Sequence, residues 1–302
     1  MVSIHNLPEE RAFFMPNQVI ITSDSSADLP PGVREEFGIH YMPIIVQVEG
    51  RSGQDCMDIF PEEIYAAFRE RGALPKTAAQ SPAAYQEFFE GFTRQGCAVV
   101  HISLNAKFSS CYQNACLAAA QAEGEVHVVD SRNFCTGQGM LCVQAARLRD
   151  AGRTAAEIAG LLEEQRSKVW ALYYLDGLDF LSKSGRCPAL LAIGASLLSL
   201  HPAVLMDGAT GDVVIGKKYR GKSAAAAEAW LRDAALRFFE ACDPSLCFFM
   251  RTPDIPPTAY EPMNRLAAEL LQGAGRVVME PVGCTIVSHV GGNCFAVVGM
   301  ER

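Results

Sequence analysis

Hydroxyl-bearing residues gather in four short segments of this chain. They are SDSSADLP at 23–30, KTAAQSP at 76–82, SLNAKFSSCYQ at 103–113 and DSRNFCTGQG at 130–139. Ser and Thr hydroxyls, together with the unpaired N–H groups of a helix start, are typical partners of an anion such as a carboxylate. In any single segment, these residues are more simply helix caps. Four such segments at one edge of a sheet favour a polar pocket.

Positive charge that could meet an anion lies in two later segments. LDFLSKSGRCP at 178–188 contains Arg186. GKKYRGK at 216–222 holds a denser cluster, Lys217, Lys218, Arg220 and Lys222. The whole chain is acidic, with 26 Lys and Arg against 34 Asp and Glu, which argues against a nonspecific nucleic-acid or anionic-membrane surface. The second cluster is therefore either a docking surface for a partner or an ordinary solvated face.

A histidine at position 289 stands in SHVGGN, which the sequence places in a glycine-rich loop. There, His289 either hydrogen-bonds a ligand or fills a turn. A zinc site would have to combine it with Cys284 and Cys294, and that spacing fits none of the common ligand pairs. We therefore expect no metal site.

Several motifs for nucleotides and acyl hydrolysis are absent or incomplete. GQGMLC at 137–142 lacks the third glycine of a dinucleotide fingerprint. The sequence contains neither G-x-x-x-x-G-K-[ST], which would hold ATP phosphates, nor the G-x-S-x-G turn of an α/β-hydrolase. We expect no cofactor and no catalytic residues.

The elements that position these segments alternate between strand and helix over the first 165 residues. Buried apolar runs predict strands at 18–22, 39–48, 97–102 and 126–129. Capping and periodicity predict helices at about 31–37, 61–72, 82–94, 110–123, 136–151 and 154–168. This order indicates a mostly parallel sheet with helices on both faces.

The rest of the chain has a different pattern of elements. We expect strands at 169–175, on both sides of the 207–212 turn, and at 245–250, 276–280 and 295–299, with helices at 188–198, 223–241 and 256–271. The fold class is therefore α/β, with an N-terminal α/β domain over residues 1–166 and a C-terminal α+β domain over 167–302.

The composition is that of a globular protein with a large core. Of the 302 residues, 49% are hydrophobic and 20% are charged. The eleven cysteines lack the spacing of a disulfide framework, so we expect reduced, mostly buried thiols and a cytoplasmic location. The N-terminus does not resemble a secretory signal. The apolar segment 189–206 is short for a membrane span and contains His201-Pro202.

These segments, in this order, resemble the DegV family of fatty-acid-binding proteins, which includes the acyl-binding subunit of bacterial fatty acid kinase. The most specific match is SDSSADLP, which resembles the family's D-S-[ST]-A-D-L-P. The other matching segments are KTAAQSP, FSSCYQNA, VVDSRNFCTGQG, LDGLDFLSKSGR, LLSLHPAV, KKYRGK and HVGGN. The resemblance covers the chain from Val19 to Gly299.

The resemblance implies a set of binding residues. It implies two α/β domains with an acyl chain buried between or beneath them, and a carboxylate held by Thr77 and Ser109. Arg186 and His289 would lie near that carboxylate. The same segments suggest further pocket residues, which are Ser25, Ser26, Asn105, Ser110 and Cys111. They also suggest a surface for docking the kinase, formed by Lys218, Arg220 and Lys222.

The chain departs from the family pattern at several of these positions. Asn105 and Ala106 stand where many members have Ser, and Ser110 and Cys111 replace Gly and Thr. In the C-terminal part, His201 replaces Lys, and Asn293 follows the glycines where Gly is usual. These changes bear on the details of head-group recognition and on chain preference.

The sequence therefore predicts a fatty-acid-binding protein that presents the carboxylate to a separate ATP-dependent kinase. Each buried CH₂ contributes about 0.8 kcal/mol, so the acyl chain would supply most of the affinity. No membrane span is expected, although transient contact with a membrane is compatible with this function. One alternative is a serine esterase or thioesterase, with Ser109 or Ser25 as nucleophile, His289 as base and Asp130 as acid. Another is a binder of a different small carboxylate.

Overall fold

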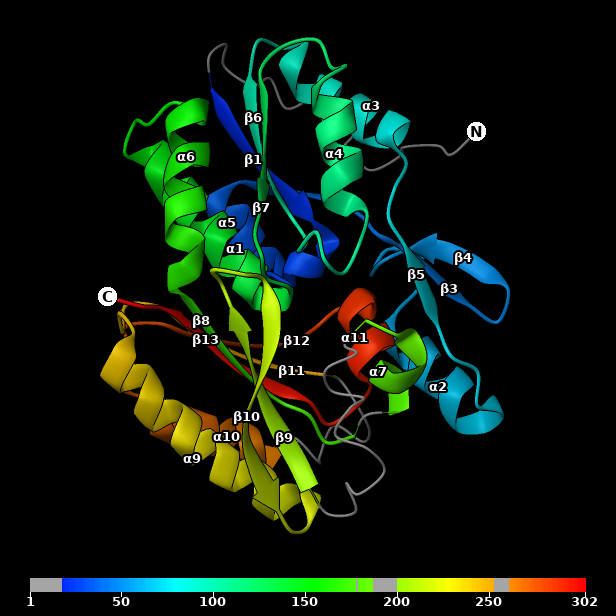
Figure 1. Cartoon of the computed structure of the whole chain (residues 1–302), viewed down its shortest axis with the longest axis vertical. Coiled ribbons are helices and arrows are strands. Elements are labelled where there is room, and N and C mark those ends of the chain that lie inside the picture. Colours follow the sequence, from blue (N-terminus) through cyan, green and yellow to red (C-terminus); the bar gives the residue numbers. More distant parts are fainter. Residues whose placement is uncertain (1–17, 178, 187–199, 253–260) are drawn as a thin grey trace.

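The computed structural model describes residues 18–177, 179–186, 200–252 and 261–302. Figure 1 shows one sheet above a second, broader one, with the short helix α11 beside the junction between them. We refer to residues 18–166 as the N-terminal half and to the rest as the C-terminal half. The predicted α/β fold class is confirmed.

The first sheet is parallel and carries the segments identified from the sequence. Its strands are β1 (Val19–Asp24), β2 (Ile39–Met42), β6 (Ala98–Ser103) and β7 (Val126–Asp130), in the order β2-β1-β6-β7. All three pairings are parallel. Every residue of β1 is buried, as expected for a central strand with helices on both faces. Because the strands are parallel, Asp24, Ser103 and Asp130 end them at the same edge.

Helices cover both faces of this sheet. They are α1 (Pro31–Phe37), α3 (Pro82–Thr93), α4 (Cys111–Ala119), α5 (Cys135–Asp150) and α6 (Ala155–Gln165). Ile20 belongs to the same core cluster as Phe89 of α3, whereas its neighbour Ile21 clusters with Leu141 of α5. This alternation is the period of a strand that is buried on both sides. Capping explains where two of the predicted helices start: before α3, Ser81 accepts from Ala84 N–H, and before α6, Thr154 forms a capping box with Glu157.

A small antiparallel sheet beside the first one was not predicted. It contains β3 (Ile45–Val48), β4 (Arg51–Gln54) and β5 (Lys76–Ala78), in the order β4-β3-β5, and α2 (Pro61–Arg71) lies between β4 and β5. The sequence predicted a strand over 39–48 that is broken by Pro43, and a loop at 76–82. The break at Pro43 is confirmed, but the part after it belongs to a second sheet. Strand β5, with three residues, is too short to show a periodicity.

The C-terminal half is built on a mixed sheet of six strands. These are β8 (Val169–Tyr174), β9 (Leu200–Asp207), β10 (Asp212–Arg220), β11 (Cys247–Arg251), β12 (Val277–Pro281) and β13 (Phe295–Met300), in the order β10-β9-β8-β13-β11-β12. Only the pair β11–β12 is parallel among these strands. On one face lie α9 (Ser223–Ala241) and α10 (Glu261–Leu270), which bury Trp230 and Met263.

The other face of this sheet packs against the N-terminal half. One core cluster contains Ile21 and Leu141 together with Val204 and Phe248. All strands before β8 belong to the first two sheets, and all strands from β8 onward belong to the third. The division into domains at 166 follows this change of sheet and stays a prediction, because the core is continuous across it.

Two short helices near the junction were also not predicted, namely α7 (Asp179–Ser184) and α11 (Cys284–Val290). The expected helix at 188–198 and the start of the one at 256–271 lie outside the described residues. None of the described helices is both long and apolar enough to cross a membrane. The described cysteines are mostly buried, as predicted, with Cys56 exposed and Cys116 half-buried.

Candidate ligand-binding site

A cavity of about 610 Å³ lies between the two halves of the chain. Its volume is in the range of small-molecule sites, roughly 300–1,000 Å³. The walls come from β5, from the loop between β6 and α4, and from α11. They include Ile44, Thr77, Ala79, Leu104, Lys107, Phe108, Ser109, Ser110, Asn114, Phe134, Leu181, Arg186, Thr285, Ile286, His289 and Val290.

The four residues predicted to bind a carboxylate all line this cavity. They are Thr77, Ser109, Arg186 and His289, and they come from four separate segments of the chain. Ser110, predicted as a further pocket residue, lines it as well and is exposed. Their individual roles stay predictions, but the fold brings them to one place.

Thr77 and His289 form a hydrogen bond across the junction, with 2.7 Å between Oγ1 and Nε2. Burial, followed by the nearby charge of Arg186, lowers the pKa of His289 to about 4. The imidazole is therefore neutral at pH 7. Its Nδ1 is buried without a hydrogen-bond partner among the described residues.

These contacts favour one arrangement of protons. If Thr77 donated to Nε2, a buried Nδ1–H donor of His289 would be left unsatisfied, which costs free energy. If Nε2–H donates instead, Nδ1 is only an acceptor, and the hydroxyl hydrogen of Thr77 stays available. Thr77 can then donate to an anion in the cavity.

Helix α11, which carries His289, is held by acidic residues of the N-terminal half. Asp55 Oδ1 accepts from Cys284 N–H at 2.8 Å, and Asp55 Oδ2 accepts from the Thr285 hydroxyl at 2.6 Å. Asp28 Oδ1 accepts from Gly283 N–H at 2.8 Å. The prediction that His289 lies in a glycine loop is wrong. His289 is in the last turn of α11, and the glycines follow it.

Ser109 lies just before α4. Its Oγ accepts from Cys111 N–H at 3.3 Å and lies 3.1 Å from Cys111 Sγ. Burial, followed by the charge of Asp24, raises the pKa of Cys111 to about 12, so this thiol is neutral at pH 7. Cys111 is buried behind Ser109 and is outside the described lining of the cavity.

The segment that carries Ser109 is positioned by Asp24, a residue that the sequence analysis did not single out. Asp24 is fully buried at the end of β1. It accepts from Ser103 Oγ and Leu104 N–H, both at 2.7 Å, and from the Tyr85 hydroxyl. Burial alone would raise the pKa of Asp24. The hydrogen bond and the charge of His101, together with the hydrogen bonds from Tyr85 and Leu104, outweigh burial, so the pKa is lowered. The position of Asp24 at the end of an apolar strand was the feature of the sequence that could have identified it.

Three other predicted pocket residues hold neighbouring segments together. Ser25 Oγ donates to Asp55 Oδ2 at 2.8 Å, and Ser26 Oγ donates to Gln138 Oε1 at 2.9 Å. Asn105 Nδ2 donates to Gly211 O at 2.9 Å. In the part of the chain that the structure describes, these three side chains lie outside the cavity lining.

An apolar cavity of about 40 Å³ abuts the polar one. The two cavities share four lining residues, Phe134, Leu181, Ile286 and Val290. The apolar cavity continues between the sheet of the C-terminal half and the start of α5, where its walls include Tyr173, Leu175, Val204, Val213, Met250, Val282 and Phe295. The whole site therefore has a polar end and an apolar end. Sequence reasoning missed these walls because they come from distant elements.

His201 and Asn293, two of the residues that depart from the family pattern, both contact the carboxylate of Asp176. His201 Nδ1 lies 3.0 Å from Asp176 Oδ1, and Asn293 Nδ2 donates to Asp176 Oδ2 at 3.3 Å. Asn293 has a φ of +55°, a conformation that asparagine tolerates better than most residues. Both substituted residues thus contact one carboxylate at the junction of β8 and α7. Neither lies in the described lining of the polar cavity.

The residues predicted for docking lie on the surface. Lys218, Arg220 and Lys222 are exposed at the end of β10 and in the turn after it. Among the described residues, they are outside the lining of the polar cavity. Arg186 is also exposed, but it lines that cavity.

The contacts expected of a serine hydrolase are not assembled among the described residues. His289 Nε2 is bonded to Thr77, and Ser25 is bonded to Asp55. Asp130 Oδ1 accepts backbone N–H groups of Ala106 and Arg132. In this part of the chain, no hydrogen bond joins His289 to Ser109 or Ser25.

Comparison with known proteins gives matches over nearly the whole chain. A family model described as "Uncharacterised protein, DegV family" matches residues 18–302. A DegV domain-containing protein of Caldanaerobacter subterraneus subsp. tengcongensis is 29% identical over 289 residues, which cover 94% of this chain and 99% of that protein.

Two solved structures are also similar over nearly the whole chain. One is described as showing fatty acid binding of a DegV family protein from Thermus thermophilus. It has a TM-score of 0.83 and 26% identity, and the match covers 94% of this chain and 100% of that one. A DegV lipid-binding protein from Thermotoga maritima has a TM-score of 0.75 and 25% identity, with coverage of 94% and 99%. The fold, the motifs and the match over residues 18–302 together show that the chain belongs to the DegV family.

Proposed function

We propose that this protein binds a fatty acid, with the carboxylate in the polar cavity and the acyl chain running along the apolar walls that the two cavities share; the apolar cavity, about 40 Å³, widens when the chain enters it. The observation that carries this proposal is the placement of Thr77, Ser109 and His289 in a cavity that abuts an apolar one. A fatty acid has the same division into a charged head and an apolar chain. The fatty-acid-binding and lipid-binding relatives from Thermus thermophilus and Thermotoga maritima support it.

In this proposal, the acyl chain provides most of the affinity. Each CH₂ removed from water contributes about 0.8 kcal/mol, so a long chain gains on the order of 10 kcal/mol before the costs of ordering it. Ile286 and Val290 of α11 lie where the two cavities meet, and they contact the first part of the chain. The carboxylate then sets the register of the ligand.

The carboxylate is recognised by hydroxyl donors and a nearby cation. Thr77 donates its free hydroxyl hydrogen, and Ser109 supplies a second hydroxyl. A hydrogen bond to a charged group contributes about 1.5–3 kcal/mol. The exposed guanidinium of Arg186 adds a cation at the mouth of the cavity.

We further propose that a separate kinase phosphorylates the bound carboxylate, and that this chain is not itself catalytic. The sequence lacks the phosphate-binding loop that ATP-dependent transfer requires. The exposed cluster of Lys218, Arg220 and Lys222 is the surface that we assign to the kinase. We place the complex in the cytoplasm, where ATP is available.

A titration with matched ligands tests the proposed binding. Palmitate should bind, while methyl palmitate should bind more weakly, because it places the same chain against the apolar walls without the charged oxygens. Octanoate should also bind more weakly, since it keeps the charge but loses most of the apolar contact. Equal affinity for palmitate and octanoate would overturn burial of the chain, and equal affinity for palmitate and its ester would overturn the carboxylate site.

A further inference from the structure

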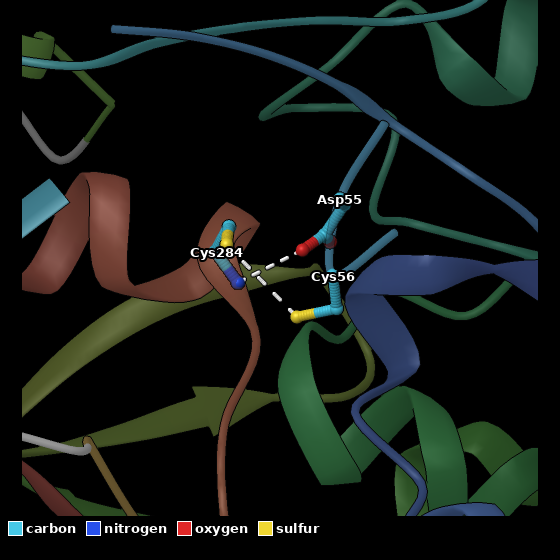
Figure 2. Close-up of side chains that lie close together, drawn as sticks. All are labelled: Asp55, Cys56 and Cys284. Carbon is cyan, nitrogen blue, oxygen red and sulfur yellow. Dashed lines mark hydrogen bonds between the residues drawn. The ribbon is translucent and has the colours of Figure 1, made fainter. Parts of the chain in front are cut away.

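Two cysteine thiols from opposite ends of the chain lie beside one another. Cys56 Sγ is 3.9 Å from Cys284 Sγ, although the two residues are 228 positions apart. Cys56 follows β4, and Cys284 is the first residue of α11. Figure 2 shows the two sulfur atoms facing each other, with the Asp55 carboxylate next to them.

The two thiols differ in their access to solvent. Cys56 is exposed and lines a separate cavity of about 480 Å³, which shares none of its described lining residues with the polar ligand cavity. Cys284 is fully buried, and its Sγ donates to Ile59 O at 3.0 Å. A small oxidant can therefore reach Cys56 directly, whereas Cys284 has no exposed surface.

A metal ion is a poorer explanation of this cluster. Asp55 is the third group within reach of the two sulfurs. Its oxygens already accept from Ser25, from the Thr285 hydroxyl, and from the N–H groups of Cys284 and Thr285. These four bonds occupy the lone pairs of the carboxylate. Two thiols alone are fewer ligands than a zinc site requires.

We propose that Cys56 and Cys284 are a reversible oxidation site, at which a peroxide converts the two thiols into a disulfide between the two halves of the chain. The bond length is about 2.05 Å, so the sulfurs must approach each other from van der Waals contact. Cys56 is in a connecting segment with a φ of +54°, and rotation of its side chain moves Sγ without disturbing the buried Cys284. Cys284 stays in place because its backbone N–H donates to Asp55.

The reaction proceeds in two balanced steps. The Cys56 sulfur attacks a peroxide oxygen and breaks the O–O bond, which gives a sulfenic acid and water after the thiol proton is transferred. The Cys284 sulfur then attacks the Cys56 sulfur, the S–O bond breaks, and a second water leaves with the Cys284 proton. Hydrogen peroxide is reduced by two electrons, and the pair of thiols is oxidised by two.

The environment of Cys284 gives the two residues different roles. The hydrogen bond with Cys56 and burial raise the pKa of the Cys284 thiol, so it stays protonated at neutral pH. Because a protonated, buried thiol reacts slowly with peroxide, the exposed Cys56 is oxidised first. Oxidation of Cys56 removes the thiol hydrogen bond that raises the pKa of Cys284, and Cys284 then loses its proton as it attacks the sulfenic acid.

The cross-link would fix the start of α11, the helix that carries Ile286 and His289. This consequence rests on the proposed fatty-acid binding, because α11 forms the wall where the polar and apolar cavities meet. A fixed α11 restricts the movement by which a ligand enters or leaves. We expect the oxidised protein to release a bound fatty acid several-fold more slowly than the reduced protein.

The test is to map the cross-link after mild treatment of the full chain with hydrogen peroxide. Free thiols are alkylated, and the digested protein is examined by mass spectrometry without reduction. We expect a peptide pair joined through Cys56 and Cys284, which dithiothreitol releases. Cys56→Ser should lack this pair, while Cys116→Ser, which removes another accessible thiol, should retain it. Complete alkylation of both residues after peroxide, or oxidation of Cys56 without a link, would overturn the proposal.

The rate of fatty-acid release provides a second, separate readout. Stopped-flow displacement should be slower after oxidation in the wild type and in Cys116→Ser, and unchanged in Cys56→Ser. An unchanged rate in a protein with a mapped disulfide would overturn the effect on release. A protein that forms the disulfide but takes up no fatty acid would instead contradict the proposed function, so the two failures are distinguishable.

Discussion

Thr77 Oγ1 and His289 Nε2 lie 2.7 Å apart, and this hydrogen bond joins the small sheet of the N-terminal half to α11 of the C-terminal half. The two residues are 212 positions apart in the chain. Both face the polar cavity, and the low pKa of His289 keeps its ring neutral. The bond thus places a hydroxyl donor, rather than a pair of charges, at the head of the site.

Removal of either hydroxyl should weaken fatty-acid binding only moderately. We expect Thr77→Ala and Ser109→Ala each to lose about 1.5–3 kcal/mol of binding free energy, because each removes one hydrogen bond to a charged group. Thr210→Ala, in the exposed turn between β9 and β10, is the matched control and should bind like the wild type. Isothermal titration with palmitate measures all three. Wild-type affinity in both site variants would place the carboxylate elsewhere.

His289 should titrate near pH 4 in the free protein, well below its ordinary value of 6.5. Since the unfolded state binds this proton more readily, the stabilising contribution of neutral His289 is present above pH 6.5 and is lost as the pH falls toward 4. NMR of the histidine ring carbons, assigned with His289→Gln, measures the pKa. A bound carboxylate favours the charged ring and should raise it.

The stability of His289→Gln provides the control for this titration. His40 is half-buried and also has a lowered pKa, so the wild type has more than one source of acid sensitivity. The difference between wild type and variant should shrink between pH 6.5 and 4. A His289 pKa at or above 6.5 in the free protein would contradict the neutral ring.

The basic residues should separate into two roles. Arg186 lines the cavity, so Arg186→Ala should weaken binding of palmitate. Arg220→Ala with Lys222→Ala should leave binding nearly intact but slow phosphorylation by a cognate kinase, because these exposed charges steer the encounter. The wild-type rate should fall as salt rises. Loss of binding and phosphorylation in parallel in the double variant would show that the cluster belongs to the pocket.

A larger side chain where the two cavities meet should shorten the preferred ligand. Ile286 lines both cavities, and Ile286→Phe places extra volume in the path of the chain. We expect it to weaken palmitate binding far more than octanoate binding, with a stability cost of about 1–3 kcal/mol from overpacking. Val214→Phe, at an exposed position of β10, should change neither. Equal losses for both acids would contradict the proposed path.

Much of the fold could be predicted from the sequence because its signals are local. The buried run of β1, the caps at Ser81 and Thr154, and the 207–212 turn each depend on neighbouring residues. Strand β5 and helix α11 were missed because each is short and is held by distant partners. Asp55 accepts from the first N–H of α11, although the two residues are 229 positions apart in the chain. The periodicity of a local segment does not reveal such a long-range contact.

The candidate site was predictable only as a set of residues. Motifs identified Thr77, Ser109 and His289, while the apolar walls at Phe134 and Ile286 became visible only when both halves were packed together. Ser25 was selected for its place in SDSSADLP, and its hydroxyl instead donates to Asp55. A motif fixes residue types in order, whereas the direction of each side chain depends on the tertiary structure.

The most direct test of fatty-acid binding is native mass spectrometry of the protein after gentle purification, followed by organic extraction of any bound species. We predict a stoichiometric long-chain fatty acid in the native complex, which exchanges for added palmitate or oleate. The absence of any acyl species, together with no uptake of either added acid, would contradict the account.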